Sequence, residues 1–468
     1  MEQWGLSLEA IEGLGERLKG FWRYYGQDSR TCTRDTRAYG LAYVSGLLRL
    51  ETRRNMAHIG RQSGVSEQNM QHYISHSPWS GRRMIERMQE AIAQRGDWAG
   101  GILILDESGD EKYGDSAAGV THQYNGRHKR VELSQVGVFV AYAKDQTWTW
   151  VDGELFLAEK WFSSAYAQRR QQADVPAERR YQKKVELGWQ MIQRAQAAGL
   201  PFVAVTFDSL YGQDTWMRDQ CQAARLEYYA DVKSTLQVYL RDPSAAFVPN
   251  SKGAVPRQPQ ILSQWAYPVK EVAEAEGTLW QTVELRPDAR GILAADFATR
   301  RVWTLREDGR VVEETLLLRR DGPHLTYTLT NAPLGTPLEV MARRKSQRYF
   351  VERAIQDAKS EFGWDEFQAV KYRAWEHHLA LTLLASWFIA ETRLDWAQDH
   401  PQDPILLEQY ETEVLPALSV ANVRDMLRAT LPLPQLSPEQ AALLVVKHLD
   451  NRTRSRKSKL KHRFKPRI

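Results

Sequence analysis

Three acidic residues stand where metal-dependent chemistry could take place. Asp106 directly follows the apolar run 102–105, Asp208 ends the apolar run 201–208, and Glu352 lies in a stretch with helical spacing. Hard cations such as Mg²⁺ bind carboxylate oxygens and keep open positions for substrate phosphate. Two such ions about 4 Å apart can stabilise both the attacking and the leaving oxygen of a phosphodiester displacement. The three acids are therefore candidate catalytic residues and metal ligands.

Charged residues follow a helical stripe around the third acid. The stretch 344–359 predicts the start of a helix, on which Arg348, Glu352 and Lys359 share one face. For this stretch alone, a solvated charged face is the commoner interpretation. The alternative is a metal-binding acid flanked by cations that hold a negatively charged substrate. Features elsewhere in the sequence distinguish the two interpretations.

The first two acids follow strands of one α/β segment. We expect a strand, two further strands, a helix, a strand, a helix and a last strand, over residues 102–106, 135–143, 147–157, 177–198, 201–208, 214–225 and 226–232. A polar loop is expected directly after Asp106. The alternation in the second half predicts a parallel component covered by helices. If the first and fourth strands are parallel neighbours, Asp106 and Asp208 emerge side by side at one sheet edge, where α/β proteins bind ligands.

A helical hairpin precedes this segment. Residues 55–62 and 67–75 predict two helices, separated by a turn in which Gly64 suits a left-handed conformation and Ser66 suits an N-cap. Four polar residues near the start of the second helix stand where a helix-turn-helix reads bases: Gln68, Asn69, Gln71 and His72. A hairpin that serves packing alone remains an alternative.

The positive charge of the chain is unevenly distributed. The net charge is +5, but the tail 452–468 alone holds nine Lys and Arg residues and no acid, including Arg454, Arg456 and Lys457. A short basic arm suits phosphate backbones through counterion release, and its alternative is a solubility tail. Two cysteines provide neither a disulfide framework nor a zinc site. The apolar run 379–390 is too short to span a bilayer, and no signal pattern is found, so we expect a cytoplasmic protein.

A β-rich region separates the second acid from the third. Residues 241–260 are rich in Pro and Ser and predict a linker, and the following sequence predicts strands with a hairpin at Asp308-Gly309. An apolar helix is expected at 374–392. We expect helical regions before and after the core.

These features resemble the DDE transposases of bacterial insertion sequences. The segments 103–114 and 119–126, and "FDSLYG" at 207–212, look like those around the two aspartates in this family. The Glu helix of the family carries Tyr-x2-Arg-x3-Glu-x6-Lys. Arg348, Glu352 and Lys359 match its last three positions, whereas Lys345 stands in place of the tyrosine.

The resemblance implies an α/β fold with an RNase H-like mixed sheet and flanking helices, interrupted by a β-rich insertion. It implies metal-dependent cleavage at element ends and strand transfer into target DNA. Asp106, Asp208 and Glu352 would bind two Mg²⁺ ions, for which Mn²⁺ could substitute. Arg348, Lys359 and Lys345 would contact DNA. The protein would form a homodimer on DNA, in the bacterial cytoplasm at the nucleoid. Two alternatives remain: a non-catalytic DNA-binding regulator derived from a transposase, and an RNase H-like nuclease without strand transfer.

The expected domain organisation follows from these segments. We expect a helical DNA-binding region, a first part of the catalytic core, the β-rich insertion, a second part of the core with the Glu helix, a helical C-terminal region and a basic tail, at 1–97, 98–240, 241–338, 339–395, 396–451 and 452–468.

Overall fold

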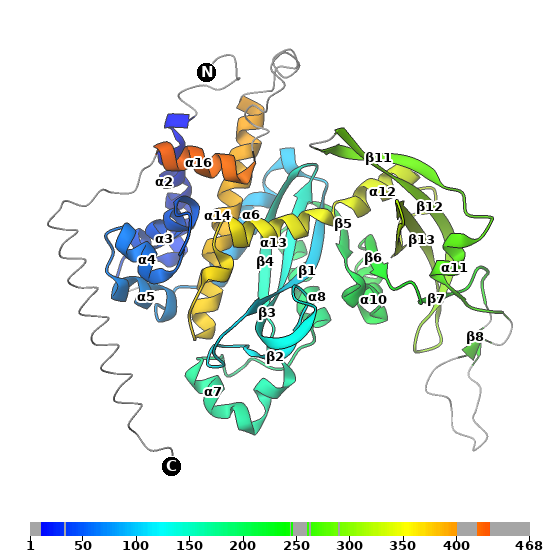
Figure 1. Ribbon diagram of the computed structural model, residues 1–468, viewed down its shortest axis with the longest axis horizontal. Coiled ribbons are helices and arrows are strands. Elements are labelled where there is room, and N and C mark those ends of the chain that lie inside the picture. Colours follow the sequence, from blue (N-terminus) through cyan, green and yellow to red (C-terminus); the bar gives the residue numbers. More distant parts are fainter. Residues whose placement is uncertain are drawn as a thin grey trace.

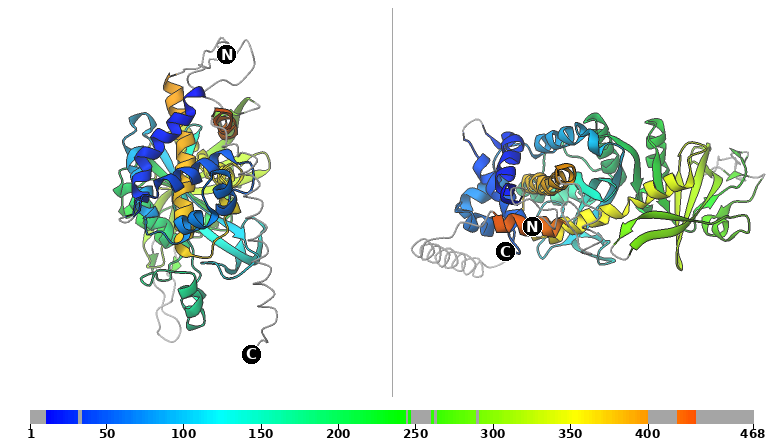
Figure 2. Two further views of the ribbon diagram at one scale, coloured as in Figure 1. Left: turned by 90° about the vertical axis from the view of Figure 1, so that its left-hand side faces the viewer. Right: turned by 90° about the horizontal axis from the view of Figure 1, so that it is seen from above.

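A computed structural model describes residues 11–31, 34–243, 245–246, 260–261, 264–288, 291–399 and 419–430. Within these residues a central sheet lies between a group of N-terminal helices and a β-rich insertion (Figure 1). The view from above in Figure 2 shows the same order, with the N-terminal helices and the insertion at opposite ends of the molecule. The expected α/β class with helical flanks is confirmed.

The N-terminal region is helical, as expected. Its elements are α2 (Leu14–Tyr25), η2 (Gly26–Ser29), α3 (Arg37–Arg49), α4 (Met56–Gln62), α5 (Glu67–Ser75), α6 (Gly81–Ala93) and η3 (Gly96–Trp98). The predicted hairpin is confirmed in α4 and α5. Asn55 caps α4 by accepting the N–H of His58, and Ser66 caps α5 by accepting the N–H of Asn69. Gly64 between them has φ of 73°, a left-handed conformation that glycine adopts without steric cost.

The core segment contains the predicted strands and several elements that the sequence did not reveal. Its strands are β1 (Gly101–Glu111), β2 (Thr121–Asn125), β3 (Arg130–Lys144), β4 (Thr147–Leu155), β5 (Phe202–Phe207) and β6 (Tyr228–Val232). Its helices are η4 (Glu159–Phe162), η5 (Ser164–Tyr166), α7 (Ala167–Gln172), α8 (Lys184–Ala197), α9 (Ser209–Gly212) and α10 (Thr215–Ala223). The expected start of α8 at residue 177 was wrong, because the helix begins only at Lys184.

The expectation that the first strand ends at Asp106 was also wrong. β1 continues to Glu111, and Asp106 pairs with Phe139 of the antiparallel neighbour β3. The polar residues after Asp106 are therefore strand residues, stabilised by the long partner β3. Polarity predicted a loop here, but pairing with a neighbouring strand outweighs local composition.

The insertion extends the core sheet. Its elements are β7 (Gln237–Val238), β8 (Ala245–Ala246), β9 (Gln260–Ile261), β10 (Tyr267–Pro268), α11 (Val269–Glu274), β11 (Gln281–Asp288), β12 (Gly291–Leu305), β13 (Val311–Asp321) and β14 (His324–Thr330). The large sheet has the order β11-β12-β13-β14-β6-β5-β1-β3-β2, with β4 on β3. The predicted hairpin at Asp308-Gly309 joins β12 to β13, with Gly309 at φ of 89°. Most of the predicted linker 241–260 lies outside the described residues.

The remaining elements cover the sheet. They are α12 (Leu338–Ser346), α13 (Tyr349–Ser360), η6 (Trp364–Glu366), α14 (Tyr372–Asp399) and α16 (Val420–Thr430). The single helix expected to start around Arg344 is two helices, α12 and α13, which follow one another from the insertion to the N-terminal helices (Figures 1 and 2). The described residues hold no helix with the length and apolar character needed to cross a membrane. Of the C-terminal region expected to be helical, the structure describes only α16 beyond Asp399.

Two hydrophobic clusters stabilise this arrangement. The large one joins the N-terminal helices, the core sheet, α13, α14 and α16, and a smaller one lies within the insertion around Val302 and Leu316. The buried side chains Phe350, Val351 and Ala354 fix the inner face of α13 against β1, β3 and β4. The opposite face of α13 is thereby left to present polar side chains.

Candidate active site

The register of two parallel strands brings the first two acids to one sheet edge. β1 and β5 pair in parallel, with Leu105 opposite Phe207 as the last pair. Asp106 and Asp208 are the next residue after this pair on each segment, so the predicted parallel pairing of the two strands is confirmed, although β1 continues beyond Asp106. Gly188 of α8 lies directly against the side chain of Leu105. Because side chains alternate along a strand, Asp106 faces the opposite side of the sheet, which α13 covers.

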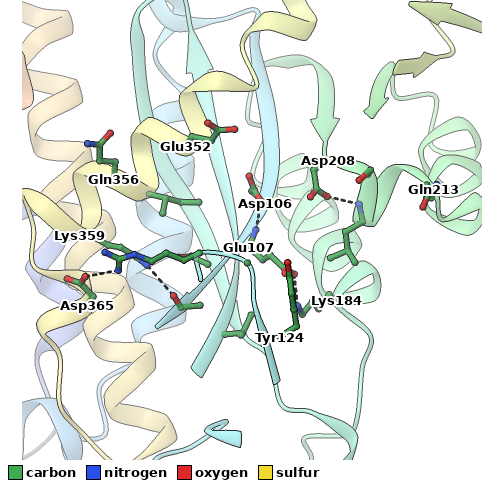
Figure 3. Close-up of a pocket in the computed structure, with 18 of the residues that line it drawn as sticks. Asp106, Glu107, Tyr124, Lys184, Asp208, Gln213, Glu352, Gln356, Lys359 and Asp365 are labelled. Carbon is green, nitrogen blue, oxygen red and sulfur yellow. Dashed lines mark hydrogen bonds and ion pairs between the residues drawn. The ribbon is translucent and has the colours of Figure 1, made fainter. Parts of the chain in front are cut away.

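The third acid reaches the same cleft from α13. Asp106, Asp208 and Glu352 all line a cleft of about 1220 Å³, and Figure 3 shows them approaching it from β1, the start of α9 and α13. The Glu352 side chain is 61% exposed, whereas that of Asp106 is 14% exposed. Asp208 caps α9 by accepting the N–H of Leu210 at 2.9 Å. One carboxylate is thus held by a sheet, one by a cap and one by a helix.

A single arginine bridges two of these acids. The guanidinium of Arg348 lies 3.5 Å from Oδ2 of Asp106 and 3.4 Å from Oε1 of Glu352. Its Nε also lies 3.6 Å from Oδ2 of Asp231 on β6. Arg348 occupies the N-cap position of α13. The stripe seen in the sequence therefore places a cation among carboxylates in the cleft, and the predicted contact with DNA stays a prediction.

Asp231 was not found from the sequence, although the same signal was present. It lies near the end of β6, the strand parallel to β5, in the pattern of an apolar strand followed by an acid. Its carboxylate accepts from Nζ of Lys345 at 3.0 Å and from the hydroxyl of Thr328 at 2.7 Å. Lys345 is only 7% exposed, so contact with DNA would require its pair with Asp231 to open.

Burial disfavours the ionised form of Asp106. Removal from water raises the pKa of Asp106 to about 7; Arg348 opposes this rise, and the negative charge of Asp208 adds to it. A bound divalent cation would supply the missing counter-charge and displace the proton. Ionised Asp106 would therefore be stabilised by a divalent cation bound beside it.

Two lysines of the cleft, Lys184 and Lys359, are paired with acids of β1. Nζ of Lys359 lies 2.7 Å from Asp110, and Nζ of Lys184 lies 2.7 Å from Glu107. Figure 3 shows Lys359 and Lys184 on opposite sides of the cleft. Lys359 thus lines the cleft with a carboxylate as its partner, and its predicted contact with DNA stays a prediction.

The predicted base-reading residues lie on the outer surface of the hairpin. Gln68, Gln71 and His72 are exposed on α5, and Asn69 is half-buried beside them. His76, which is also exposed, stacks on His72 with ring centroids 5.7 Å apart. Arg454, Arg456 and Lys457 of the basic tail lie outside the described residues.

The three acids fit a divalent metal site. They supply only oxygen donors, which suit hard cations, and they leave cleft volume for a phosphate. A second group of possible ligands, Glu111, His128 and Glu132, lies within 4.8 Å of one another. Glu132 there accepts from Arg130 at 2.6 Å and from Asn125 at 2.8 Å, so its oxygens are already in use.

Comparison with known proteins agrees with this geometry. A family model described as DDE superfamily endonuclease matches residues 29–291, more than half of the chain. The chain therefore belongs to the DDE superfamily of endonucleases, and membership of this family implies the use of a divalent metal ion. The matched range contains Asp106 and Asp208, whereas Glu352 lies beyond it.

The chain is also similar to a protein of a narrower class. The chain is 23% identical over 322 residues to a probable transposase for insertion sequence element IS701 of Microchaete diplosiphon. The similarity covers 68% of this chain and 73% of that protein.

Proposed function

We propose that this endonuclease is a DNA transposase, which cleaves DNA at the ends of an insertion element and joins the freed ends to target DNA. The observation that carries the proposal is the convergence of Asp106, Asp208 and Glu352 on one cleft. The family membership and the resemblance to a probable transposase support it.

The acids and cations of the cleft would have different roles in catalysis. Asp106, Asp208 and Glu352 would hold two Mg²⁺ ions, for which Mn²⁺ could substitute, and these ions would stabilise charge on the attacked phosphate. Arg348 and Lys359 would turn from their carboxylate partners to the phosphates of the substrate, because a metal ion takes over the neutralisation of the acids. Lys345 would stay with Asp231 and fix the start of α13.

The chemistry consists of two displacements at phosphorus. In the first, water attacks a phosphodiester at the element end, one P–O bond forms, another breaks, and a 3′-hydroxyl is released. In the second, this 3′-hydroxyl attacks a phosphodiester of the target and releases a target 3′-hydroxyl. The cleft must therefore accept first water and then a DNA end as the nucleophile. Because two element ends are joined to one target, we propose that the protein acts as a homodimer on DNA.

The test is a cleavage and joining assay. Full-length protein is incubated with Mg²⁺ or Mn²⁺ and a duplex that carries the candidate element end, and nicked and joined products are separated. We expect both products from the wild type and from Asp115→Ala, a control at an exposed acid that is absent from the cleft lining. We expect neither product from Asp208→Ala.

The possible outcomes separate the proposal from its alternatives. Binding of the duplex by the wild type without any cleavage would identify a regulator. Cleavage without joined products would identify a nuclease that lacks strand transfer.

A further inference from the structure

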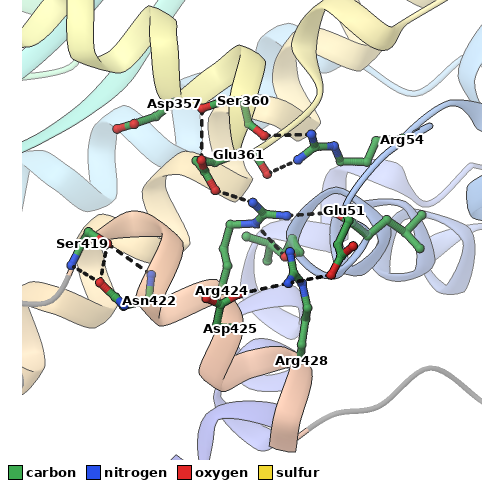
Figure 4. A network of polar contacts seen from close by, with 12 residues as sticks. Glu51, Arg54, Asp357, Ser360, Glu361, Ser419, Asn422, Arg424, Asp425 and Arg428 are labelled. Carbon is green, nitrogen blue, oxygen red and sulfur yellow. Dashed lines mark hydrogen bonds and ion pairs between the residues drawn. The ribbon is translucent and has the colours of Figure 1, made fainter.

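The C-terminal end of α13 is tied to the helical hairpin by one buried arginine. Arg54 stands directly before Asn55, the N-cap of α4. Its guanidinium donates to the carbonyl oxygens of Ser360 and Glu361 at 2.8 and 2.6 Å. Figure 4 shows these two contacts at the end of the helix. Such carbonyls have no partner within their own helix, and they carry the negative end of its dipole.

Further contacts fix Arg54 itself. Glu366, just after α13, accepts from the backbone N–H of Arg54 and from its Nε at 3.2 Å and Nη2 at 3.0 Å. Arg54 is 3% exposed. Gly363 has φ of 65°, and a Cβ atom there would lie 2.7 Å from Cβ of Arg54. The loop after α13 is thus shaped around this side chain.

A second arginine, from the C-terminal helix α16, also contacts the junction between the end of α13 and the loop before α4. Arg424 of α16 donates to the carbonyls of Leu48 and Leu50, both at 2.8 Å, and pairs with the carboxylate of Glu361 (Figure 4). Leu48 and Leu50 lie at the end of α3, where the loop to the hairpin begins. The end of α13 and this loop are therefore held together from two sides.

Glu352 lies on the same rigid element as this junction. Eight residues separate it from Ser360, which corresponds to about 12 Å along an α-helix. α13 carries no described break between Tyr349 and Ser360, so a shift of its end also moves the carboxylate. Metal ligands must hold their positions within about 0.5 Å, and helix shifts of about 1–2 Å are common in switching proteins.

We infer that Arg54 is a positioning residue through which DNA bound at the α4–α5 hairpin and metal bound at the acids strengthen one another. The inference rests on the proposed function, because it takes the hairpin as the DNA-binding element and the three acids as the metal site. DNA on the hairpin would hold the loop before α4, and Arg54 would thereby hold Glu352 in its metal-binding position. Coupling between two ligands is reciprocal, so each should raise the affinity of the other by the same factor.

The experiment measures Mn²⁺ affinity by electron paramagnetic resonance on the full-length protein, with and without the duplex that carries the candidate element end. For the wild type we expect the duplex to tighten Mn²⁺ binding at least about fivefold. For Arg54→Gln we expect Mn²⁺ and the duplex each still to bind alone. The duplex should then change the Mn²⁺ affinity of this variant by less than about twofold. Arg17→Gln, which removes another half-buried arginine network between α2 and α14, should keep the wild-type coupling.

Two results would overturn the inference: full coupling in Arg54→Gln, or no coupling in a wild type that binds both ligands. If Arg54→Gln does not fold, Glu366→Gln, which keeps the arginine but weakens its hold, should show reduced coupling, and full coupling there overturns the inference as well. Asp208→Asn separates this inference from the proposed function. Mn²⁺ binding that is unchanged in Asp208→Asn contradicts the metal site itself, whatever Arg54 does.

Discussion

Arg348 lies 3.5 Å from Asp106, in the cleft where a metal ion is expected. The arginine partly neutralises the acid and competes with a cation for it. Its charge is also within reach of Glu352. The first prediction follows from this position.

Arg348→Gln should bind Mn²⁺ more tightly than the wild type and cleave DNA more slowly. Affinity rises because a positive charge leaves the site. Cleavage falls, by about 100-fold or more, because a cation that would meet the phosphate is lost. Calorimetric titration and a cleavage assay measure the two effects. Arg353→Gln on the same helix, which pairs with Asp357, serves as the control. Weaker Mn²⁺ binding in Arg348→Gln would show that the arginine supports the metal site instead.

The second prediction concerns the turn around Arg54. Gly363→Ala should lower the free energy of unfolding by about 1–2 kcal/mol for the left-handed backbone alone, and by more because of the close approach to Arg54. Gly335→Ala is the matched control, since Gly335 has φ of 87° and no atom within 4 Å of an added Cβ. Urea denaturation of both variants separates the two contributions. Equal losses would mean that the loop accommodates the methyl group without cost.

The third prediction concerns a buried acid of α14. Burial raises the pKa of Glu376 to about 7, and the charge of Glu154 adds to this, whereas Arg82 and Arg179 oppose it. Between pH 4.5 and 7 the unfolded chain loses this proton and the folded chain keeps it, so the free energy of unfolding falls with rising pH.

Glu376→Gln removes this penalty. The variant should be more stable than the wild type by about 1–3 kcal/mol at pH 8, and the difference should vanish near pH 4. Thermal or urea unfolding across this range measures it, with Glu90→Gln at an exposed position of α6 as the control. A loss of stability at pH 8 would mean that ion pairing with Arg82 outweighs the cost of burial.

The fourth prediction concerns the hairpin. Gln71 is exposed on α5, and a bidentate contact of glutamine with adenine contributes about 1–3 kcal/mol of discrimination. Gln71→Ala should therefore weaken binding to the candidate element end by about 5- to 100-fold and leave binding to unrelated DNA unchanged. Gln146→Ala, at the exposed turn between β3 and β4, should alter neither. Equal loss on both kinds of DNA would contradict a base-reading role.

Much of the fold was predictable from the sequence, because its signals are local. The cap at Ser66, the left-handed turn at Gly64 and the Asp308-Gly309 turn were predicted because they fix their elements through contacts a few residues away. Apolar runs revealed β5 and most of β3. The polar half of β1 could not be recognised, since only its pairing with β3 makes it a strand.

The part of the site that could be predicted from the sequence is the part that follows directly after the paired strands β1 and β5. The parallel pairing of β1 with β5 follows from the alternation of elements, and it brings Asp106 next to Asp208. The partners of the cations depend on distant contacts. Arg54 with Ser360, and Lys345 with Asp231, join segments that are far apart in the chain, and no pattern of spacing reveals such pairs.

The central claim is that Asp106, Asp208 and Glu352 share divalent cations. Anomalous diffraction from crystals of the protein with element-end DNA and Mn²⁺ tests it most directly. We predict Mn²⁺ peaks in the cleft, bound by these three carboxylates. Peaks confined to Glu111, His128 and Glu132, or a cleft that holds DNA and Arg348 but no Mn²⁺, would contradict the account.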